Sequence, residues 1–337
     1  MTSKALEPRP WLTPLSWLYR GVVAARNMTF DRGWRRIDRL PVPVVSVGNL
    51  TVGGTGKTPF IVLLVERFQK AGLRVGVLAR GYGKRTGQDL NDEGELLARR
   101  FPGLPQVQEP SRFAGGQRLL RDHRVDVVLL DDGFQHRMLH RDVDVCLVDA
   151  KEPLDRALLP AGWAREPASS LARADVCVLT GAERVSDNDL RARIDEVRSR
   201  FDGMPCYAVK TTVRDLVEYP GGAVHTPTSL EGRPVVLVAA IARPERFESS
   251  ALALGCDVVE RHWLRDHQEI DASFLADKSR DAQARDAWLL LTEKDEARLR
   301  LPPDAGPTRH VLRIRSEFTH DPGIEAFLPA VLASTVS

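Results

Sequence analysis

The sequence has few cysteines, few aromatic residues and almost no net charge. Its 337 residues include four cysteines, and none belongs to a CxxC pair (Cys146, Cys177, Cys206 and Cys256). This spacing argues against a zinc ribbon and against a disulfide-stapled fold, so we expect four buried thiols. Because 48 basic residues oppose 46 acidic ones, the formal net charge is only +2. That balance excludes the strong positive field typical of nucleic-acid-binding proteins.

Long hydrophobic runs are also lacking. No run approaches the roughly 20 apolar residues that span a bilayer, and residues 11–25 are interrupted by Pro14 and Arg20. We therefore expect neither a membrane-spanning helix nor a secretory signal. Apolar residues at 43% and charged residues at 28% are typical of a folded globular chain. The length favours two domains.

The first 40 residues combine basic charge with an aromatic and aliphatic surface. Arginines flank a stretch that contains Trp11, Leu15, Trp17 and Leu18. One interpretation is an amphipathic helix that lies on an anionic membrane leaflet, with tryptophans at headgroup depth. The other is a helix that packs on its own domain, since most amphipathic helices face a protein core. The sequence leaves both open.

Short apolar runs that end in Gly or Asp follow Pro41 and Pro43. Such runs are typical of parallel strands buried on both faces, and their spacing leaves room for crossover helices. The clearest helix is expected at 58–70, with Pro59 in its first turn and Gly72 beyond its end. The expected strands are 42–47, 74–79, 125–130, 143–148 and 174–179.

The second half has its own alternating pattern. Residues 206–213 and 216–219, before Pro220-Gly221-Gly222, read as an extended connector. Beyond it we expect strands at 234–241, 256–263, 287–292 and 310–314, and a helix at 244–254. The predicted fold is α/β: a P-loop NTPase-like parallel-sheet domain, a second, smaller α/β domain and an N-terminal amphipathic helix. The predicted boundaries are 1–40 for the helix region, 41–208 for the nucleotide-binding domain, 209–230 for the linker and 231–337 for the smaller domain.

A glycine-rich loop joins the first predicted strand to the clearest helix. Such a loop turns its backbone N–H groups toward phosphate oxygens, and the helix N-terminus adds positive potential. Lys57 would reach the terminal phosphates of ATP, and Thr58 would ligate Mg²⁺. The strict motif has Gly where Thr51 stands. The expected phosphate-binding residues are Gly53, Gly54, Thr55, Gly56, Lys57 and Thr58.

Two carboxylates end the strand predicted at 125–130. Asp131 and Asp132 are placed as in nucleotide enzymes that hold Mg²⁺ at the end of a neighbouring strand. Adjacent carboxylates repel each other unless a cation holds them, which favours a metal over a solvated strand end. Gln135 and His136 follow, and would bring an amide and an imidazole beside the metal and phosphates.

These and further segments together resemble the tetraacyldisaccharide 4′-kinase family. Eight motifs occur in the family's order and approximate spacing, and Thr at position 51 is itself usual in the family. They are SVGNLTVGGTGKTP (46–59), ARGYG (79–83), DDGFQH (131–136), RDVDVCLVDA (141–150), LLPAGWAREP (158–167), RPERF (243–247), RDHQ (265–268) and TEKDEAR (292–298).

The resemblance implies roles for residues that carry no signal alone. Asp92 would take the proton from the acceptor hydroxyl and would pair with His267. It lies in a turn with the sequence Asn-Asp-Glu-Gly, where the family has a GDEP-like sequence. Asp131, Asp132 and Gln135 would surround the metal, and Glu166 is a further candidate. The basic residues Arg80, Lys84, Arg85 and Arg112 would engage the sugar phosphate or form a solvated face. We expect Asp92 and His267 to meet only across an interdomain cleft.

The resemblance implies transfer of the ATP γ-phosphoryl group to the 4′-hydroxyl of a tetraacylated glucosamine disaccharide 1-phosphate, a lipid A precursor, with Mg²⁺. The alternative is a membrane-associated P-loop ATPase switch without a chemical acceptor. The expected partners are the lipid substrate and the membrane surface, with no nucleic acid and no obligate protein partner. The expected location is peripheral or monotopic, on the cytoplasmic face of the bacterial inner membrane.

Overall fold

The structure is a computed structural model that describes residues 9–82, 89–299, 301 and 304–328. Lys84 and Arg85 lie outside the described residues. Within the described ranges, no helix combines the length and the apolar character needed to cross a membrane. The chain divides into two compact units. Unit 1 comprises Met1–Tyr82, Leu104–Thr211 and Ser316–Ser337, and unit 2 comprises Gly83–Gly103 and Thr212–Arg315.

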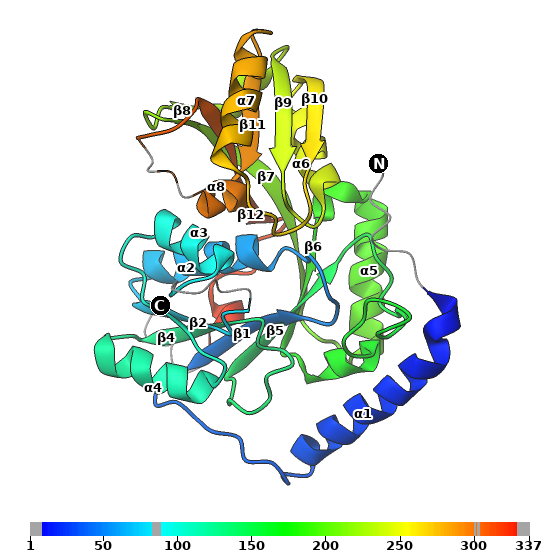
Figure 1. The fold of residues 1–337 in the computed structure, drawn as a ribbon. Helices are drawn as coiled ribbons and strands as arrows, with labels where there is room; N and C mark the ends of the chain where they lie inside the picture. The colour runs from blue at the N-terminus through cyan, green and yellow to red at the C-terminus, as the bar shows by residue number, and fades with distance from the viewer. Residues whose placement is uncertain (1–8, 83–88, 300, 302–303, 329–337) are drawn as a thin grey trace. The chain divides into compact units, whose positions relative to one another are not determined.

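Unit 1 is built on a parallel sheet in the strand order β6-β5-β1-β4-β2-β3, with the first part of β7 beside β6. Figure 1 shows helices α2 and α4 on opposite sides of these strands. The central strands are entirely buried, because each is a short continuous apolar run covered on both faces. The strands are β1 Val44–Asn49, β2 Val75–Ala79, β3 Gln106–Gln108, β4 Val127–Asp131, β5 Val143–Asp149 and β6 Val176–Thr180; the helices are α2 Lys57–Lys70, α4 Arg112–Asp122 and α5 Asp187–Arg200.

Helix α1 (Thr13–Asp31) packs on unit 1 through one face. Ser16, Val23 and Phe30 are buried at seven-residue intervals, which places them on one side of the helix. The Ser16 hydroxyl donates to the Leu158 carbonyl at 2.9 Å, and the Tyr19 hydroxyl donates to the Arg165 carbonyl at 3.0 Å. The packed-helix interpretation is therefore correct for this face, while the opposite face remains exposed.

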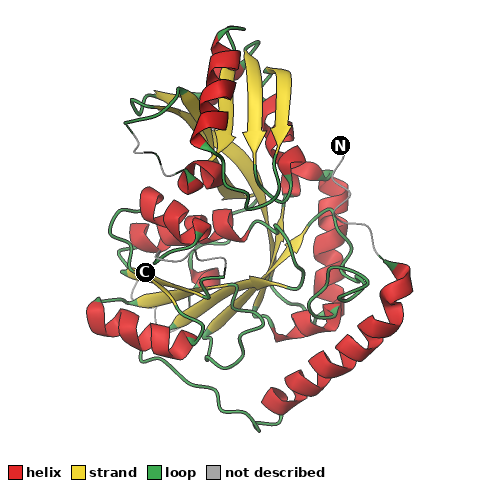
Figure 2. Ribbon diagram, in the orientation of Figure 1, coloured by secondary structure: helices red, strands yellow, loops and turns green. Residues whose placement is uncertain are grey.

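Unit 2 holds a second set of strands in the order β10-β9-β11-β12-β7. Figure 2 distinguishes its strands from its helices. β9 pairs in parallel with β10 and β11, and β8 pairs antiparallel with β7. The strands are β7 Cys206–Tyr219, β8 Val224–His225, β9 Pro234–Ala239, β10 Asp257–Trp263, β11 Trp288–Thr292 and β12 Arg309–Phe318; the helices are α3 Asp92–Arg100, α6 Pro244–Leu252, α7 Ala272–Gln283 and α8 Glu293–Arg298. Short 3-10 helices span Pro10–Leu12, Ala168–Arg173, Ala182–Arg184, Pro227–Leu230 and Glu325–Phe327.

The predicted fold class is confirmed, and the predicted strands lie within a few residues of the observed ones. Three expectations about organisation differ from the structure. Residues 206–219 form one strand, β7, which pairs in parallel with β6 from Cys206 onward, so they are not merely a connector. The segment Gly83–Gly103 belongs to unit 2, because α3 packs against α8, whereas the sequence placed it in the nucleotide-binding domain. The segment Ser316–Ser337 belongs to unit 1, whereas the sequence placed it in the smaller domain. The four cysteines are buried and free, as expected.

Candidate functional site

The glycine-rich loop of unit 1 takes backbone conformations that favour glycine. Gly53 has φ +101° and Gly56 has φ +81°, both in a region that L side chains rarely adopt. Gly56 caps α2, which begins at Lys57. No side chain caps this end and no acidic residue occupies its first turn. The N–H groups of the first turn are thus presented at a helix N-terminus with positive potential, the arrangement that binds phosphate.

The loop after β4 lies close against the end of β1. Val47 of β1 pairs with Asp131, and the Gly133 N–H donates to the Val47 carbonyl at 3.1 Å. A Cβ atom on Gly48 would lie 2.5 Å from the Phe134 Cβ, so only glycine allows this approach. The close packing brings the two carboxylates predicted as metal ligands beside the phosphate-binding loop.

Lys57 joins the two halves of this site. Its Nζ donates to Asn49 Oδ1 at 2.9 Å and lies 3.3 Å from Asp132 Oδ1. The Lys57 side chain is 19% exposed, so its charge is only partly solvated. Because Asn49 and Asp132 hold the ammonium from two sides, it is fixed near the start of α2, where a terminal phosphate would need it.

Asp132 is held by a second cation, Arg165. Arg165 Nη1 lies 2.8 Å from Asp132 Oδ2 and donates to Gln135 Oε1 at 3.2 Å. Gln135 Nε2 in turn donates to the Asn49 carbonyl at 2.9 Å. Burial favours the neutral acid, but Lys57 and Arg165 outweigh it and hold the pKa of Asp132 below its usual range. Asp132 is therefore ionised, as a metal ligand must be.

The predicted metal ligands offer hard oxygen donors of the kind that Mg²⁺ takes. Asp131 ends β4 and Asp132 follows it at φ +52°, while Thr58 is the second residue of α2. The residues fit a magnesium ion bound mainly through carboxylates and phosphate oxygens. Gln135 fits less directly, because both ends of its amide are engaged by Asn49 and Arg165.

The candidates His136 and Arg112 interact with each other, and Arg112 also interacts with the two carboxylates. Burial and the arginines Arg112, Arg141 and Arg26 lower the pKa of His136 to about 4, so the ring is neutral at pH 7. Arg112 is 4% exposed, and its Nη1 donates to the Pro110 carbonyl at 3.0 Å. This buried guanidinium interacts electrostatically with Asp131 and Asp132, so it is suited to hold anionic groups near them.

Glu166 occupies a different position from the other candidates. It is 1% exposed, and its carboxylate accepts from Arg173 Nη1 at 2.9 Å and from Asn27 Nδ2 at 2.8 Å. These contacts tie α1 to the segment that carries Arg165. Glu166 thus positions its neighbours. The residue of this segment that contacts Asp132 is Arg165, which the sequence analysis did not single out.

In unit 2 the structure brings Asp92 and His267 together. His267 Nδ1 lies 2.9 Å from Asp92 Oδ2, and Arg298 Nε donates to the same oxygen at 2.6 Å. Burial alone would raise the pKa of Asp92, but the hydrogen bond from His267 and the guanidinium of Arg298 lower it to about 2. The predicted pairing is therefore present. The predicted route was wrong, because both residues belong to unit 2 and need no interdomain cleft to meet.

Asp92 is also not in a turn. It is the first residue of α3, which Asn91 caps by accepting from the Gly94 N–H at 3.1 Å. The next residue, Glu93, pairs with Lys294 of α8 at 2.6 Å.

Arg298 is itself anchored within unit 2. Its Nη1 donates to the Ala240 carbonyl and lies 3.2 Å from Asp295 Oδ1. The sequence analysis used the segment 292–298 as a motif but did not single out Arg298. A charged residue near the end of a strand gives no sign in the sequence of which carboxylate it will contact.

Comparisons with known proteins identify the family. The family model of tetraacyldisaccharide-1-P 4′-kinase matches residues 8–333. The chain belongs to this family. A tetraacyldisaccharide 4′-kinase of Chlorobium luteolum is 35% identical over 315 residues, covering 87% of each chain. One of Ectopseudomonas mendocina is 37% identical over 302 residues, covering 86% of this chain and 84% of the relative.

The fold comparison leads to the same family. The crystal structure of LpxK from Aquifex aeolicus in complex with ATP has a TM-score of 0.75 and 28% identity, covering 95% of this chain and 99% of that one. Membership makes the chain a kinase of lipid A biosynthesis, as the motifs predicted.

Proposed function

We propose that this kinase binds ATP at the glycine-rich loop of unit 1 and uses Asp92 of unit 2 to receive the proton of the acceptor, the 4′-hydroxyl of a tetraacylated glucosamine disaccharide 1-phosphate. The ordered contacts of Lys57 support the nucleotide half. The Asp92–His267 contact is the observation that supports the proposed role of Asp92 toward the acceptor.

For ATP, the N–H groups at the start of α2 and the Lys57 ammonium bind the phosphates. Phosphoryl transfer depends mainly on positioning and on stabilising charge over the phosphate oxygens. Thr58, Asp131 and Asp132 would hold Mg²⁺, which when bound supplies positive charge to the phosphates. Arg165 keeps Asp132 ionised and oriented. Arg112 is proposed to neutralise a second anionic group, the existing phosphate of the lipid.

For the acceptor, a carboxylate with a pKa of about 2 is fully ionised at neutral pH. Such a weak base orients the hydroxyl and receives its proton late, as the new P–O bond forms. His267 donates from Nδ1 to Asp92 Oδ2, so it keeps the carboxylate ionised and in place while Asp92 itself receives the proton. Arg298 is a positioning residue that fixes the same oxygen.

The lipid acceptor requires a membrane-facing surface, and α1 offers one. Trp11, in the short 3-10 helix before α1, and Leu15, Trp17, Leu18 and Val22 of α1 are each more than half exposed. Apolar side chains of this size beside arginines suit the interface of an anionic leaflet. We propose that α1 places the enzyme on the cytoplasmic face of the inner membrane as a peripheral protein.

ATP consumption tests the proposed function against the ATPase alternative. We expect ATP to be consumed only when the acylated disaccharide 1-phosphate is present, in proportion to the lipid phosphorylated. Equal ATP hydrolysis without lipid would instead support a nucleotide switch. The Lys57→Met variant serves as the control for contaminating ATPases, because it loses the phosphate contact.

A further inference from the structure

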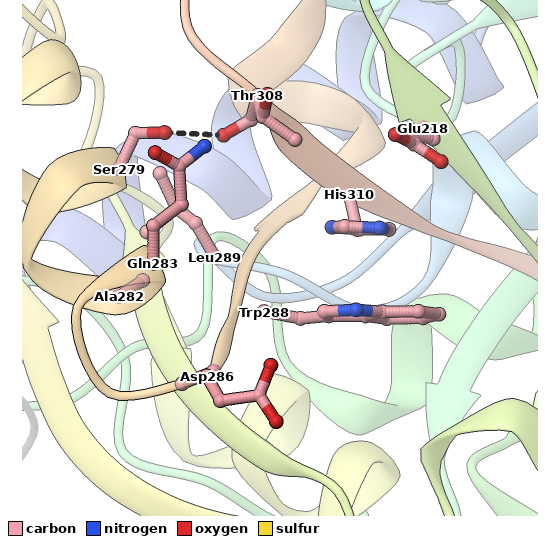
Figure 3. Close-up of a pocket in the computed structure, with 10 residues that line it drawn as sticks. Glu218, Ser279, Ala282, Gln283, Asp286, Trp288, Leu289, Thr308 and His310 are labelled. Atoms are coloured by element: carbon pink, nitrogen blue, oxygen red, sulfur yellow. Dashed lines mark hydrogen bonds between the residues drawn. The ribbon is translucent and has the colours of Figure 1, made fainter.

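A cluster of metal-binding side chains lies in unit 2, among residues that the kinase chemistry does not use. Glu218 comes from β7, His225 from β8 and His310 from β12. One ligand atom from each lies within 4.8 Å of the other two. Figure 3 shows Glu218 beside the His310 ring at a pocket, with Trp288 stacked below that ring.

One ring nitrogen of His310, in this cluster, lacks a hydrogen-bond partner among the described residues. The residue is 4% exposed, and the unpartnered nitrogen is its Nδ1. Buried polar atoms are nearly always paired, so an unpartnered one calls for an explanation. Trp288 stacks on the ring with centroids 3.8 Å apart and planes at 5°, which fixes its orientation.

The separations suit a small ion after a modest movement. His225 Nε2 lies 3.0 Å from Glu218 Oε2. In a tetrahedral site with metal–ligand bonds of about 2.0–2.1 Å, ligand atoms lie about 3.4 Å apart. Glu218 and His225, at 3.0 Å, are slightly closer than that spacing, and the nitrogen of His310, within 4.8 Å, need approach by at most about 1.4 Å.

The donor set selects the kind of ion. Two imidazoles and one carboxylate match the ligands of open zinc sites, in which water takes the fourth position. Mg²⁺ and Ca²⁺ prefer all-oxygen ligands, so they are poor candidates. We propose that Glu218, His225 and His310 form a binding site for Zn²⁺ or a similar divalent transition metal, tying the β7–β8 hairpin to β12.

A neighbouring cavity gives the site an entry path. The cavity has a volume of about 270 Å³, and Glu218, Trp288 and His310 are among its lining residues. Water and a hydrated ion can therefore reach the ligands, and the fourth position can face the cavity. One nearby charge opposes a cation: the Arg233 guanidinium lies 4.4 Å from the Trp288 ring centroid. The Glu218 carboxylate offsets that charge at the site itself.

Cobalt absorption tests the site directly, since Co²⁺ in a tetrahedral protein site gives a strong visible band. The full chain is first stripped with a chelator and then titrated with Co²⁺, without nucleotide and with excess Mg²⁺ to occupy oxygen-only sites. We expect one equivalent to produce the band and Zn²⁺ to displace it. If the wild-type chain gives no such band, the proposal is overturned, whatever the variants do.

Variants of the two partly exposed ligands assign the band to this cluster. His225→Gln and Glu218→Gln each remove a ligand without opening the core, and should weaken Co²⁺ binding at least tenfold. His262→Gln is the matched control, because His262 also pairs with a glutamate in unit 2, Glu260 at 2.8 Å, without completing the cluster. An unchanged band in the first two variants would contradict the assignment.

Zn²⁺ should also raise the melting temperature of the wild type by about 5 °C, but not that of His225→Gln.

Discussion

Asp92 Oδ2 lies 2.9 Å from His267 Nδ1, although 175 positions separate the two residues in the chain. The same oxygen accepts from Arg298 Nε at 2.6 Å. One carboxylate oxygen is thus held by two basic side chains. This arrangement gives Asp92 a fixed direction and a full negative charge.

Replacing Asp92 by asparagine should remove the proton acceptor while keeping the side-chain shape. We expect kcat to fall by about 10²–10⁴-fold, as for loss of a general base, with ATP affinity within about twofold of the wild type. Steady-state kinetics and equilibrium nucleotide binding measure the two effects. Asp89→Asn, an exposed carboxylate in the same segment, is the control. An Asp92→Asn enzyme with normal kcat would remove Asp92 from the mechanism.

The pKa of Asp92 depends on His267. Carboxyl NMR titration should give about 2 in the wild type and a higher value in His267→Gln, which lacks the ionisable partner. Because the folded-state pKa lies below the ordinary value of 3.8, the charge of Asp92 stabilises the fold fully above about pH 4. That contribution is lost as the pH falls toward 2. Between about pH 4 and pH 2, the unfolding free energy of His267→Gln should therefore fall less steeply than that of the wild type. Identical titrations would refute the coupling.

Lys57→Met tests the nucleotide half separately. Losing a charged hydrogen bond to phosphate should weaken ATP binding by about 10–100-fold. The variant also loses the ammonium that lies 3.3 Å from Asp132, so the pKa of Asp132 should rise. Lys70→Met, at the other end of α2 and exposed, should bind ATP normally. Equal affinities in the two variants would place the phosphates elsewhere.

The exposed face of α1 predicts how the enzyme partitions onto membranes. Trp17 and Leu18 are 70% and 69% exposed, so replacing both by serine should leave the fold intact. Binding to anionic vesicles should fall by about tenfold or more, because each side chain contributes apolar area to the interface. Leu252→Ser, an exposed leucine of α6, is the control. Vesicle sedimentation that does not change would mean that α1 does not anchor the enzyme.

The sequence predicted unit 1 well because its strands are buried on both faces. β1, β4 and β5 read as continuous apolar runs, which the packing of a parallel sheet requires. β7 mixes buried and partly exposed positions, so its 14 residues looked like a connector. Periodicity gave no sign of α3 either, because charged residues fill its first turn.

The candidate sites were predicted unevenly for a similar reason. Glycine and lysine in the phosphate-binding loop are required by backbone geometry and charge, so the motif itself identifies them. The pairing of Asp92 with His267 came only from the family resemblance. Arg165 and Arg298 were missed, because a partner supplied from another segment is visible only once the chain has folded.

Phosphoryl transfer to the lipid hydroxyl can be read from the lipid product itself. Purified enzyme, ATP and the tetraacylated disaccharide 1-phosphate are incubated, and the recovered lipid is examined by mass spectrometry and by NMR of its sugar ring. We predict a gain of one phosphate at the 4′-position with the wild type and with Asp89→Asn, and none with Asp92→Asn. A lipid of unchanged mass, despite consumed ATP, would contradict the account.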